Sequence, residues 1–222
     1  MSISSNILKL NKDIQRIKDA HNITYPINVL VATKYANPEH IPILIENGLC
    51  LFGENRLQQF EYKFKEDNKE ASWHMIGHLQ TNKVNKVVRF FNCIESLDSF
   101  KLIEKVNESA TNQNKPMEGF IQVNIANDPK KYGFTKKEVQ DNIDKFFSFK
   151  MLKIKGIMAI VPYMEDAELC RSYFKEMKAL FDTVQGAYPS VQTLSMGMSN
   201  DYHIAIEEGA NLIRIGSLIF KE

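Results

Sequence analysis

Cysteine, glycine and proline are all scarce in this sequence. Its 222 residues include 3 Cys, 10 Gly and 7 Pro. So little glycine and proline excludes collagen and disordered low-complexity chains. Cys50, Cys93 and Cys170 are far apart and odd in number, so their spacing indicates neither a zinc site nor a redox pair. Free thiols in a reducing compartment are the simplest interpretation, and we expect a cytoplasmic protein.

The sequence also lacks long apolar runs and an excess of either charge. No apolar run approaches the roughly 20 residues that span a bilayer. Charged residues between Lys9 and Asp19 interrupt the start of the chain, which excludes the apolar core of a signal peptide. The 28 basic and 27 acidic side chains leave a net charge of +1, a field too weak to drive binding to nucleic acid or to an anionic membrane. We expect a small metabolite as partner, no nucleic-acid or membrane contact, and a monomer or weak dimer.

One pattern recurs along the whole chain: a short apolar, β-branched run, a turn, and a stretch with helical spacing. The expected strands are Ile27–Lys34, Leu49–Glu54, Trp73–Gly77, Phe91–Leu97, Gly119–Ala126, Ile154–Ile160, Val191–Met198 and Leu212–Phe220. The expected helices include Ser4–Ala20, Glu39–Asn47, Ser99–Thr111, Lys136–Phe147, Ala167–Gln185 and Tyr202–Glu208. Continuous apolar runs indicate strands buried on both faces, as in a parallel sheet. The pattern predicts an α/β fold, a (β/α)8 TIM barrel with an extra N-terminal helix and a single domain over residues 1–222. An open doubly wound sheet is the alternative.

Lys34 ends the first apolar run, at the position where (β/α)8 barrels carry their chemistry. Partial desolvation there disfavours the ammonium form and makes the amine a nucleophile toward a carbonyl. The alternative is a lysine that extends from the strand end into water.

Two further motifs follow the second and third strands. Phe52-Gly53-Glu54-Asn55 offers close backbone approach, a carboxylate and an amide, although a plain strand-to-helix turn capped by Asn55 explains it as well. His74 and His78 lie four residues apart, but Gly77 interrupts the segment and no acidic or cysteine ligand accompanies them. A metal site is therefore not favoured.

The last two strands point to an anion. Ser195–Asp201 and Arg214–Ser217 are rich in small and hydroxylated residues, and the loops after strands seven and eight of such barrels frequently bind phosphate. Simple capping and tight packing are the alternative. Arg214 lies inside an apolar run, so it requires a carboxylate or a ligand atom as partner.

One ligand fits this combination of features, which are an imine-forming lysine, a phosphate site and an arginine between them. Pyridoxal 5′-phosphate (PLP) carries an aldehyde for Lys34, a phosphate for the serine and glycine loops, and a pyridine nitrogen for Arg214. A sugar-phosphate isomerase or aldolase on the same barrel explains Lys34 and the loops but leaves Arg214 without a role.

These residues resemble the pyridoxal phosphate homeostasis proteins, single-domain (β/α)8 barrels similar to the N-terminal domain of bacterial alanine racemase. The resemblance extends from Leu8 to Phe220. The matching motifs are Val31-Ala32-Thr33-Lys34, Phe52-Gly53-Glu54-Asn55, Trp73 to Lys83, Gly156-Ile157-Met158-Ala159, Leu194 to Ser199 and Arg214-Ile215-Gly216-Ser217. The sequence departs from the family's pattern at Arg56, at Gln59, in Pro129 to Gly133 and at its final residues, Phe220-Lys221-Glu222.

The resemblance implies a role for each matching residue. Lys34 holds PLP as a Schiff base, and Ser199, Gly216 and Ser217 hold the phosphate. The residues that line the pocket around the ring are Asn55, His74, Met158, Ser195 and Arg214. The family is thought to bind PLP and supply it to apo-enzymes, with no established turnover.

The alternative is a PLP-dependent amino-acid racemase, which needs a proton donor and an acceptor on opposite faces of the imine. Alanine racemases take the second base from another domain of a partner subunit, whereas this sequence ends with the barrel. A guanidinium at Arg214 also disfavours a protonated pyridine nitrogen, which weakens the ring as an electron sink. We therefore expect a carrier. Because alanine racemase works with an arginine there, the racemase stays the alternative, with Tyr163, Tyr202 or His203 as candidate base.

Overall fold

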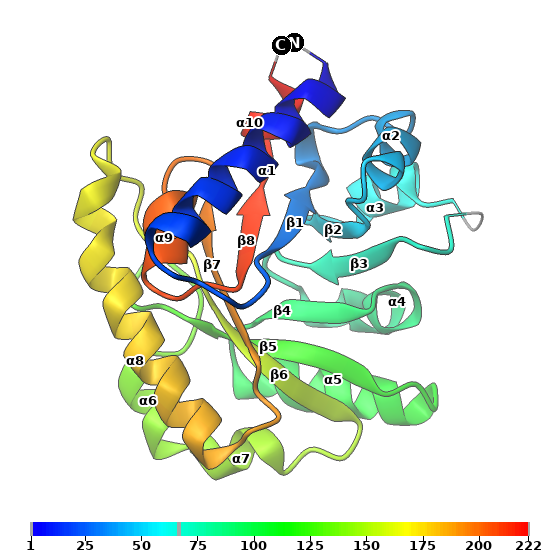
Figure 1. Ribbon diagram of the computed structural model, residues 1–222. Helices are drawn as coiled ribbons and strands as arrows, with labels where there is room; N and C mark the ends of the chain where they lie inside the picture. The colour runs from blue at the N-terminus through cyan, green and yellow to red at the C-terminus, as the bar shows by residue number, and fades with distance from the viewer. Residues whose placement is uncertain (1, 66–67, 222) are drawn as a thin grey trace.

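Eight parallel strands close into a barrel in the computed structural model, which describes residues 2–65 and 68–221 (Figure 1). The strands are β1 (Asn28–Ala32), β2 (Leu51–Glu54), β3 (Ser72–Met75), β4 (Cys93–Leu97), β5 (Met117–Val123), β6 (Leu152–Ala159), β7 (Thr193–Met198) and β8 (Leu212–Ile215). They follow one another around the barrel in chain order, and β1 pairs with β8, with Val31 opposite Ile215. The predicted (β/α)8 barrel is confirmed, and the open sheet is wrong.

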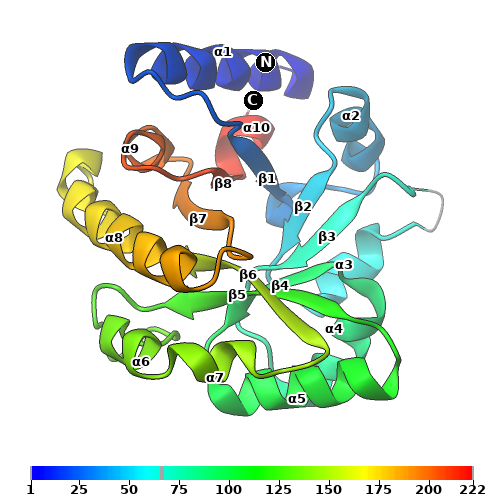
Figure 2. The ribbon, with the colours of Figure 1, turned by 60° about the horizontal axis from the view of Figure 1, so that its bottom comes forward.

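The helices surround this barrel, as the view in Figure 2 shows. They are α1 (Ile3–Ala20), α2 (His40–Glu46), α3 (Leu57–Lys63), α4 (Val84–Phe90), α5 (Phe100–Asn112), α6 (Lys136–Asp141), α7 (Ile143–Phe147), α8 (Arg171–Ala187), α9 (Tyr202–Glu207) and α10 (Ser217–Phe220). The described residues also form the 3₁₀ turns η1 (Thr33–Tyr35), η2 (Thr81–Lys83) and η3 (Ala167–Cys170). The extra N-terminal helix α1 packs against α9 and α10, and the Asn6 amide donates to the carbonyls of Ile219 and Lys221.

The apolar core has an outer and an inner part. The outer part lies between the strands and the helices, where the rings of Phe52, Phe60 and Trp73 pack against one another. The inner part fills the barrel and consists of Leu30, Ile76, Cys93, Phe120, Met158 and Leu212. Strand side chains alternate between the two parts. Gly53 faces inward without a side chain, because a Cβ there would lie 2.3 Å from Leu30 Cδ2.

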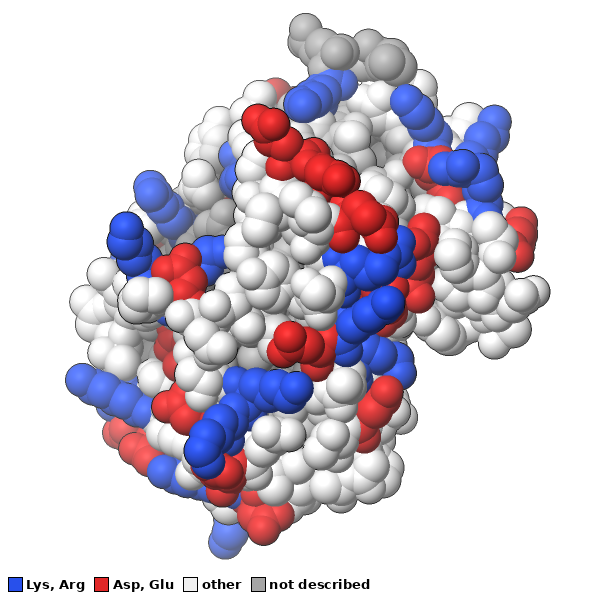
Figure 3. Space-filling model, turned by 90° about the vertical axis from the view of Figure 1, so that its left-hand side faces the viewer, with Lys and Arg blue, Asp and Glu red and all other residues white. Residues whose placement is uncertain are grey.

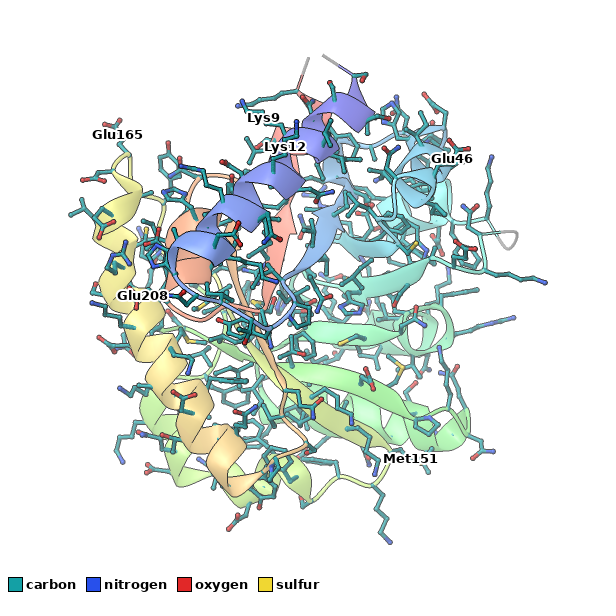
Figure 4. All side chains as sticks on the ribbon, viewed as in Figure 1. Lys9, Lys12, Glu46, Met151, Glu165 and Glu208 are labelled. Atoms are coloured by element: carbon teal, nitrogen blue, oxygen red, sulfur yellow. The ribbon has the colours of Figure 1, made fainter. Side chains whose placement is uncertain are left out.

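The two ends of β6 help to orient the barrel in Figure 4. Met151 directly precedes β6, and Glu165 lies in the loop that follows it. The parallel strands all end on the side of Glu165, which is therefore the face where a (β/α)8 barrel carries its site.

Several predicted boundaries are wrong, among them those of the first strand, the eighth strand and one helix. The first strand stops at Ala32, so that Lys34 lies in η1 rather than at the strand end. The eighth strand stops at Ile215, because Gly216 leaves the strand conformation at φ −126° and ψ −76° and Ser217–Phe220 forms α10. The helix predicted over Lys136–Phe147 is two helices separated at Asn142.

Charged side chains mostly serve local contacts on the surface. Arg171 bonds to Glu207 and Glu208 and so joins α8 to α9; Glu208 is labelled in Figure 4. Lys115 Nζ donates to the carbonyls of Val88, Arg89 and Phe91 at the end of α4, at 2.7, 3.0 and 2.9 Å. Basic and acidic groups are interspersed on the face in Figure 3.

The three cysteine thiols are free, as predicted. Over the described part of the chain, no helix combines the length and the apolar character that crossing a bilayer requires.

Candidate functional site

The predicted site residues lie at the strand ends on one face of the barrel. Lys34 follows β1 in η1, and Asn55 follows β2. His74, Met158, Ser195 and Arg214 lie on β3, β6, β7 and β8, Ser199 follows β7, and Gly216 and Ser217 follow β8 at the start of α10. The topology alone thus brings residues from six strands together.

The Lys34 turn and the Gly216 turn are in contact. They leave the neighbouring strands β1 and β8, and a Cβ on Gly216 would lie 3.1 Å from the Ala32 carbonyl oxygen and 3.6 Å from Tyr35 Cδ2. The Gly216 N–H donates to Ser199 Oγ at 3.3 Å, which brings the loop after β7 to the same place. The predicted amine and the predicted phosphate loops therefore adjoin.

The Lys34 side chain is exposed, with Nζ 4.6 Å from the centre of the Tyr35 ring. The sequence predicted a partly dehydrated amine at a strand end, and this is wrong. The physical reason is the early end of β1, which places Lys34 in a turn outside the apolar layer. The amine can be reached directly from the mouth of the barrel.

A buried polar network crosses the barrel below the mouth. Arg214 donates from Nη1 to Ser195 Oγ and from Nη2 to the Ala159 carbonyl oxygen, both at 2.7 Å. The Ser195 hydroxyl in turn donates to Glu95 Oε2 at 2.7 Å, and Glu95 Oε1 lies 2.7 Å from His74 Nδ1. Arg214 therefore has its carboxylate partner, reached through one hydroxyl.

Glu95 is the site residue that the sequence reasoning missed. It lies on β4 and is fully buried. The signal was available, because an acidic residue in the apolar run Cys93-Ile94-Glu95-Ser96-Leu97 requires a partner as much as Arg214 does. An ionised carboxylate only accepts hydrogen bonds, so a proton on His74 Nδ1 satisfies this contact with Glu95.

Burial changes the acid–base properties of this layer. It lowers the pKa of Arg214, an effect that the nearby charges of Glu95 and Asp201 oppose. It also raises the pKa of the Cys93 thiol well above its ordinary value, and the Glu95 charge acts in the same direction. Cys93 is therefore an inert thiol in the core rather than a nucleophile.

The next part of the mouth, after β2 and β3, holds Asn55 and His78. His78 Nδ1 lies 2.6 Å from Asp98 Oδ2, and its ring stacks on Tyr132 at 3.7 Å between centroids. His74 and His78 thus bond to different carboxylates. A cavity of about 280 Å³ bordered by Asn55, His78 and Tyr132 and another of about 730 Å³ bordered by Asn55 and His78 adjoin this edge.

Two expectations for the Phe52-Gly53-Glu54-Asn55 motif are wrong, the Asn55 cap and the Glu54 carboxylate at the site. Asn55 is exposed and does not cap α3, whose first flanking residue is Arg56. Glu54 is buried outside the barrel wall, where Lys63 of α3 pairs with it, so its carboxylate does not face the mouth.

The end of β7 and the loop after it depend on a glycine and on a buried acid. Gly197 has φ +89°, and a Cβ there would lie 2.5 Å from the Ala205 Cβ, so other residues are strained at this position. The Asp201 carboxylate accepts a hydrogen bond from the Met198 N–H at 2.6 Å and so closes the turn that contains Ser199.

Asp201 predicts a specific pH dependence of stability. Burial raises its pKa above the ordinary 3.8, although the Met198 N–H and the Arg214 charge oppose the shift. The folded state then binds this proton more tightly than the unfolded chain, so ionisation costs stability as the pH rises from 3.8 through the folded-state pKa. Asp201→Asn keeps the acceptor without the charge. We expect it to unfold at higher urea than the parent at pH 7, with the difference disappearing below pH 3.8.

The matched control is Asp182→Asn, which removes an exposed carboxylate on α8. Urea unfolding of the three proteins across this pH range measures the effect. A gap between Asp201→Asn and the parent that stays constant with pH would contradict the assignment.

Comparison with known proteins decides the family. A family model described as "Alanine racemase, N-terminal domain" matches residues 35–222. The pyridoxal phosphate homeostasis protein of Aquifex aeolicus is 36% identical over 196 residues, which cover 87% of this chain and 86% of that protein. The chain belongs to this family.

A second curated relative and two solved structures agree. The protein of that name from Pasteurella multocida is 32% identical and covers 99% of this chain and 97% of its own length. The structure of PipY from Synechococcus elongatus without PLP superposes with a TM-score of 0.87 at 28% identity, covering 99% of this chain and 100% of PipY. The structure of PipY with PLP bound gives 0.81 at 27% identity, covering 94% and 99%.

Alanine racemase of Clostridium difficile shares the fold alone. It is 12% identical, with a TM-score of 0.73 over 98% of this chain and 57% of the racemase. The family resemblance expected from the sequence motifs is confirmed by the family model and the curated relatives.

Proposed function

We propose that this protein binds PLP at the mouth of its barrel, holds it through a Schiff base on Lys34, and delivers it to apo-enzymes in the cytoplasm. The observation that carries the proposal is the contact between the Lys34 turn and the Gly216–Ser217 turn at the ends of neighbouring strands. The family's name and the PLP bound to PipY support it.

The donors at this end of the barrel fit a phosphate. The Gly216 N–H and the half-buried hydroxyls of Ser199 and Ser217 are neutral donors in one place. Because α10 has four residues, its dipole adds little, and we assign the phosphate to these three groups. The Ser199 hydroxyl can turn from Gly216 toward an anion without breaking any secondary structure.

The exposed Lys34 amine fits the aldehyde. The Nζ lone pair attacks the aldehyde carbon, a C=N bond replaces C=O, and the oxygen leaves as water with both amine hydrogens. The remaining proposed contacts around the ring are Asn55, His74, Met158, Ser195 and Arg214. Met158 is fully buried in the inner core and gives the site an apolar floor.

Arg214 favours a carrier over a racemase. A guanidinium cannot take the proton of a pyridinium and disfavours its positive charge, so the bound ring stabilises a carbanion less. Tyr202 is also unsuited as a racemase base, since its hydroxyl donates to Asp13 at 2.7 Å and burial raises its pKa. Tyr163, another candidate base of the racemase alternative, is 74% exposed on the loop after β6.

The decisive experiment is an absorbance spectrum of the protein as isolated, before and after borohydride. We expect an imine band that reduction removes, and peptide mass mapping should place the reduced adduct on Lys34. An adduct on another lysine, or no imine after incubation with PLP, would refute the assignment.

Delivery and turnover need separate assays. Holoprotein is mixed with the apo form of a PLP-dependent enzyme. It should restore that enzyme's activity faster than free PLP does when free PLP is supplied at the concentration in equilibrium with the holoprotein. Single-enantiomer alanine incubated with holoprotein should stay single-enantiomer on chiral chromatography. Multiple turnovers to the mirror form would establish the racemase instead.

A further inference from the structure

The turn that carries Lys34 is held by the residue before it. Thr33 is fully buried, and its carbonyl oxygen accepts a hydrogen bond from the Ala36 N–H at 2.8 Å, which closes the turn around Lys34 and Tyr35. The same carbonyl accepts a second hydrogen bond, from Lys63 Nζ at 2.7 Å. An ammonium group from α3 is thus bound to the atom that closes the Lys34 turn.

Lys63 is itself part of a buried ion pair. Its Nζ lies 2.5 Å from Glu54 Oε1, and the two side chains are 4% and 0% exposed. The Thr33 hydroxyl donates to the same Glu54 oxygen at 2.5 Å and lies 3.2 Å from the Gly53 carbonyl oxygen. Strand β2 and helix α3 therefore hold Thr33 by its side chain and its backbone together.

This ion pair is poorly explained by stability alone. A buried pair recovers its desolvation cost only when hydrogen bonds satisfy the remaining polar atoms. Glu54 Oε2 is buried and has no hydrogen-bond partner among the described residues. An apolar contact could join β2 and α3 without the desolvation cost. Apolar side chains could not bond to the Thr33 carbonyl and hydroxyl, however, as Lys63 and Glu54 do.

We propose that Lys63 and Glu54 are positioning residues that fix the direction of Lys34 toward the Gly216–Ser217 turn. The inference rests on the proposed Schiff base at Lys34. A lysine on a free turn samples many directions, and attack on a carbonyl depends steeply on the placement of the nitrogen. The pair acts from outside the barrel wall, through Thr33, and does not touch the ligand.

The test separates imine formation from binding of the phosphate and ring. The double variant Glu54→Gln/Lys63→Met removes both buried charges together, which avoids leaving one unpaired. We expect its rate of imine formation with PLP, followed by stopped-flow absorbance, to fall roughly tenfold to hundredfold. Binding of pyridoxine 5′-phosphate, which has an alcohol in place of the aldehyde, should stay within about twofold by calorimetry.

Two further variants keep the test decisive. Thr33→Val removes the hydroxyl contacts with Glu54 and the Gly53 carbonyl but keeps the Thr33 carbonyl that Lys63 binds, and it should slow imine formation by a smaller factor even if the double variant is poorly folded. The single variant Lys63→Arg retains a cationic donor, so it should keep part of the imine-formation rate that the double variant loses. The matched control is Lys115→Met, which also removes a lysine bonded to backbone carbonyls and should leave the imine rate unchanged.

The outcomes are distinct. Unchanged imine formation in both the double variant and Thr33→Val would overturn the positioning role. Equal losses for PLP and pyridoxine 5′-phosphate would also overturn it, because they would indicate general damage to the pocket. Absence of a Lys34 imine in the parent protein would instead refute the proposed function itself.

Discussion

Lys34→Ala should lose the imine band completely while remaining as stable as the parent protein. The Lys34 side chain is exposed, and its contact with the described residues is to the exposed Tyr35 ring. The free energy of unfolding should therefore change by no more than about 0.5 kcal/mol. Affinity for PLP should fall about a hundredfold, which corresponds to roughly 2.8 kcal/mol, since the phosphate and ring contacts remain.

Absorbance titration with PLP and urea unfolding of the same variant measure both effects. The control is Lys131→Ala, which removes another lysine at the mouth of the barrel, beside Tyr132. It should retain the imine. A full band in Lys34→Ala, or its loss only in Lys131→Ala, would move the Schiff base to another lysine and contradict the assignment.

Glu95→Gln should cause a large loss of stability. The Arg214 guanidinium is buried, and Glu95, reached through Ser195, is the carboxylate of its hydrogen-bonded network. Removing one charge of a buried pair leaves the other uncompensated and costs about 3 kcal/mol. In a chain of this size that corresponds to roughly 6–12 °C in Tm.

A double-mutant cycle tests the pairing rather than the residue. Arg214→Met alone leaves Glu95 with the His74 and Ser195 contacts but without the guanidinium charge and should also be destabilising, but the combined Glu95→Gln/Arg214→Met should cost at least about 1 kcal/mol less than the sum. Urea unfolding gives each value. Additive losses would mean that the two charges do not compensate each other across Ser195.

The barrel was predictable because its signal is repeated along the chain. Eight apolar runs separated by helical stretches leave few alternative topologies, and the site face then follows from the strand direction. The end of β8 was not predictable in this way. Ser217–Phe220 continues an apolar run, and periodicity cannot distinguish a short buried helix from a strand over so few residues.

The site was predictable where a residue's own environment is unusual. Arg214 stands out in an apolar strand, and its need for a partner is met by Glu95 through Ser195. Lys63 lies on an amphipathic helix with nothing in its local sequence to mark it, and its role depends on Thr33, which only the folded chain brings near. The exposure of Lys34 likewise depends on where β1 ends, which sequence patterns locate poorly.

The inner core has a consequence for how a ligand travels. Leu30, Phe120 and Leu212 are buried in the inner core of the barrel, and Ile76 joins them from just beyond the end of β3, so apolar side chains occupy the space that a passage to the far end of the strands would need. Anything bound beside Lys34 must leave by the route it entered. A recipient that takes PLP directly from this protein must therefore approach the same opening. Free ligand and recipient then compete for access to the mouth of the barrel.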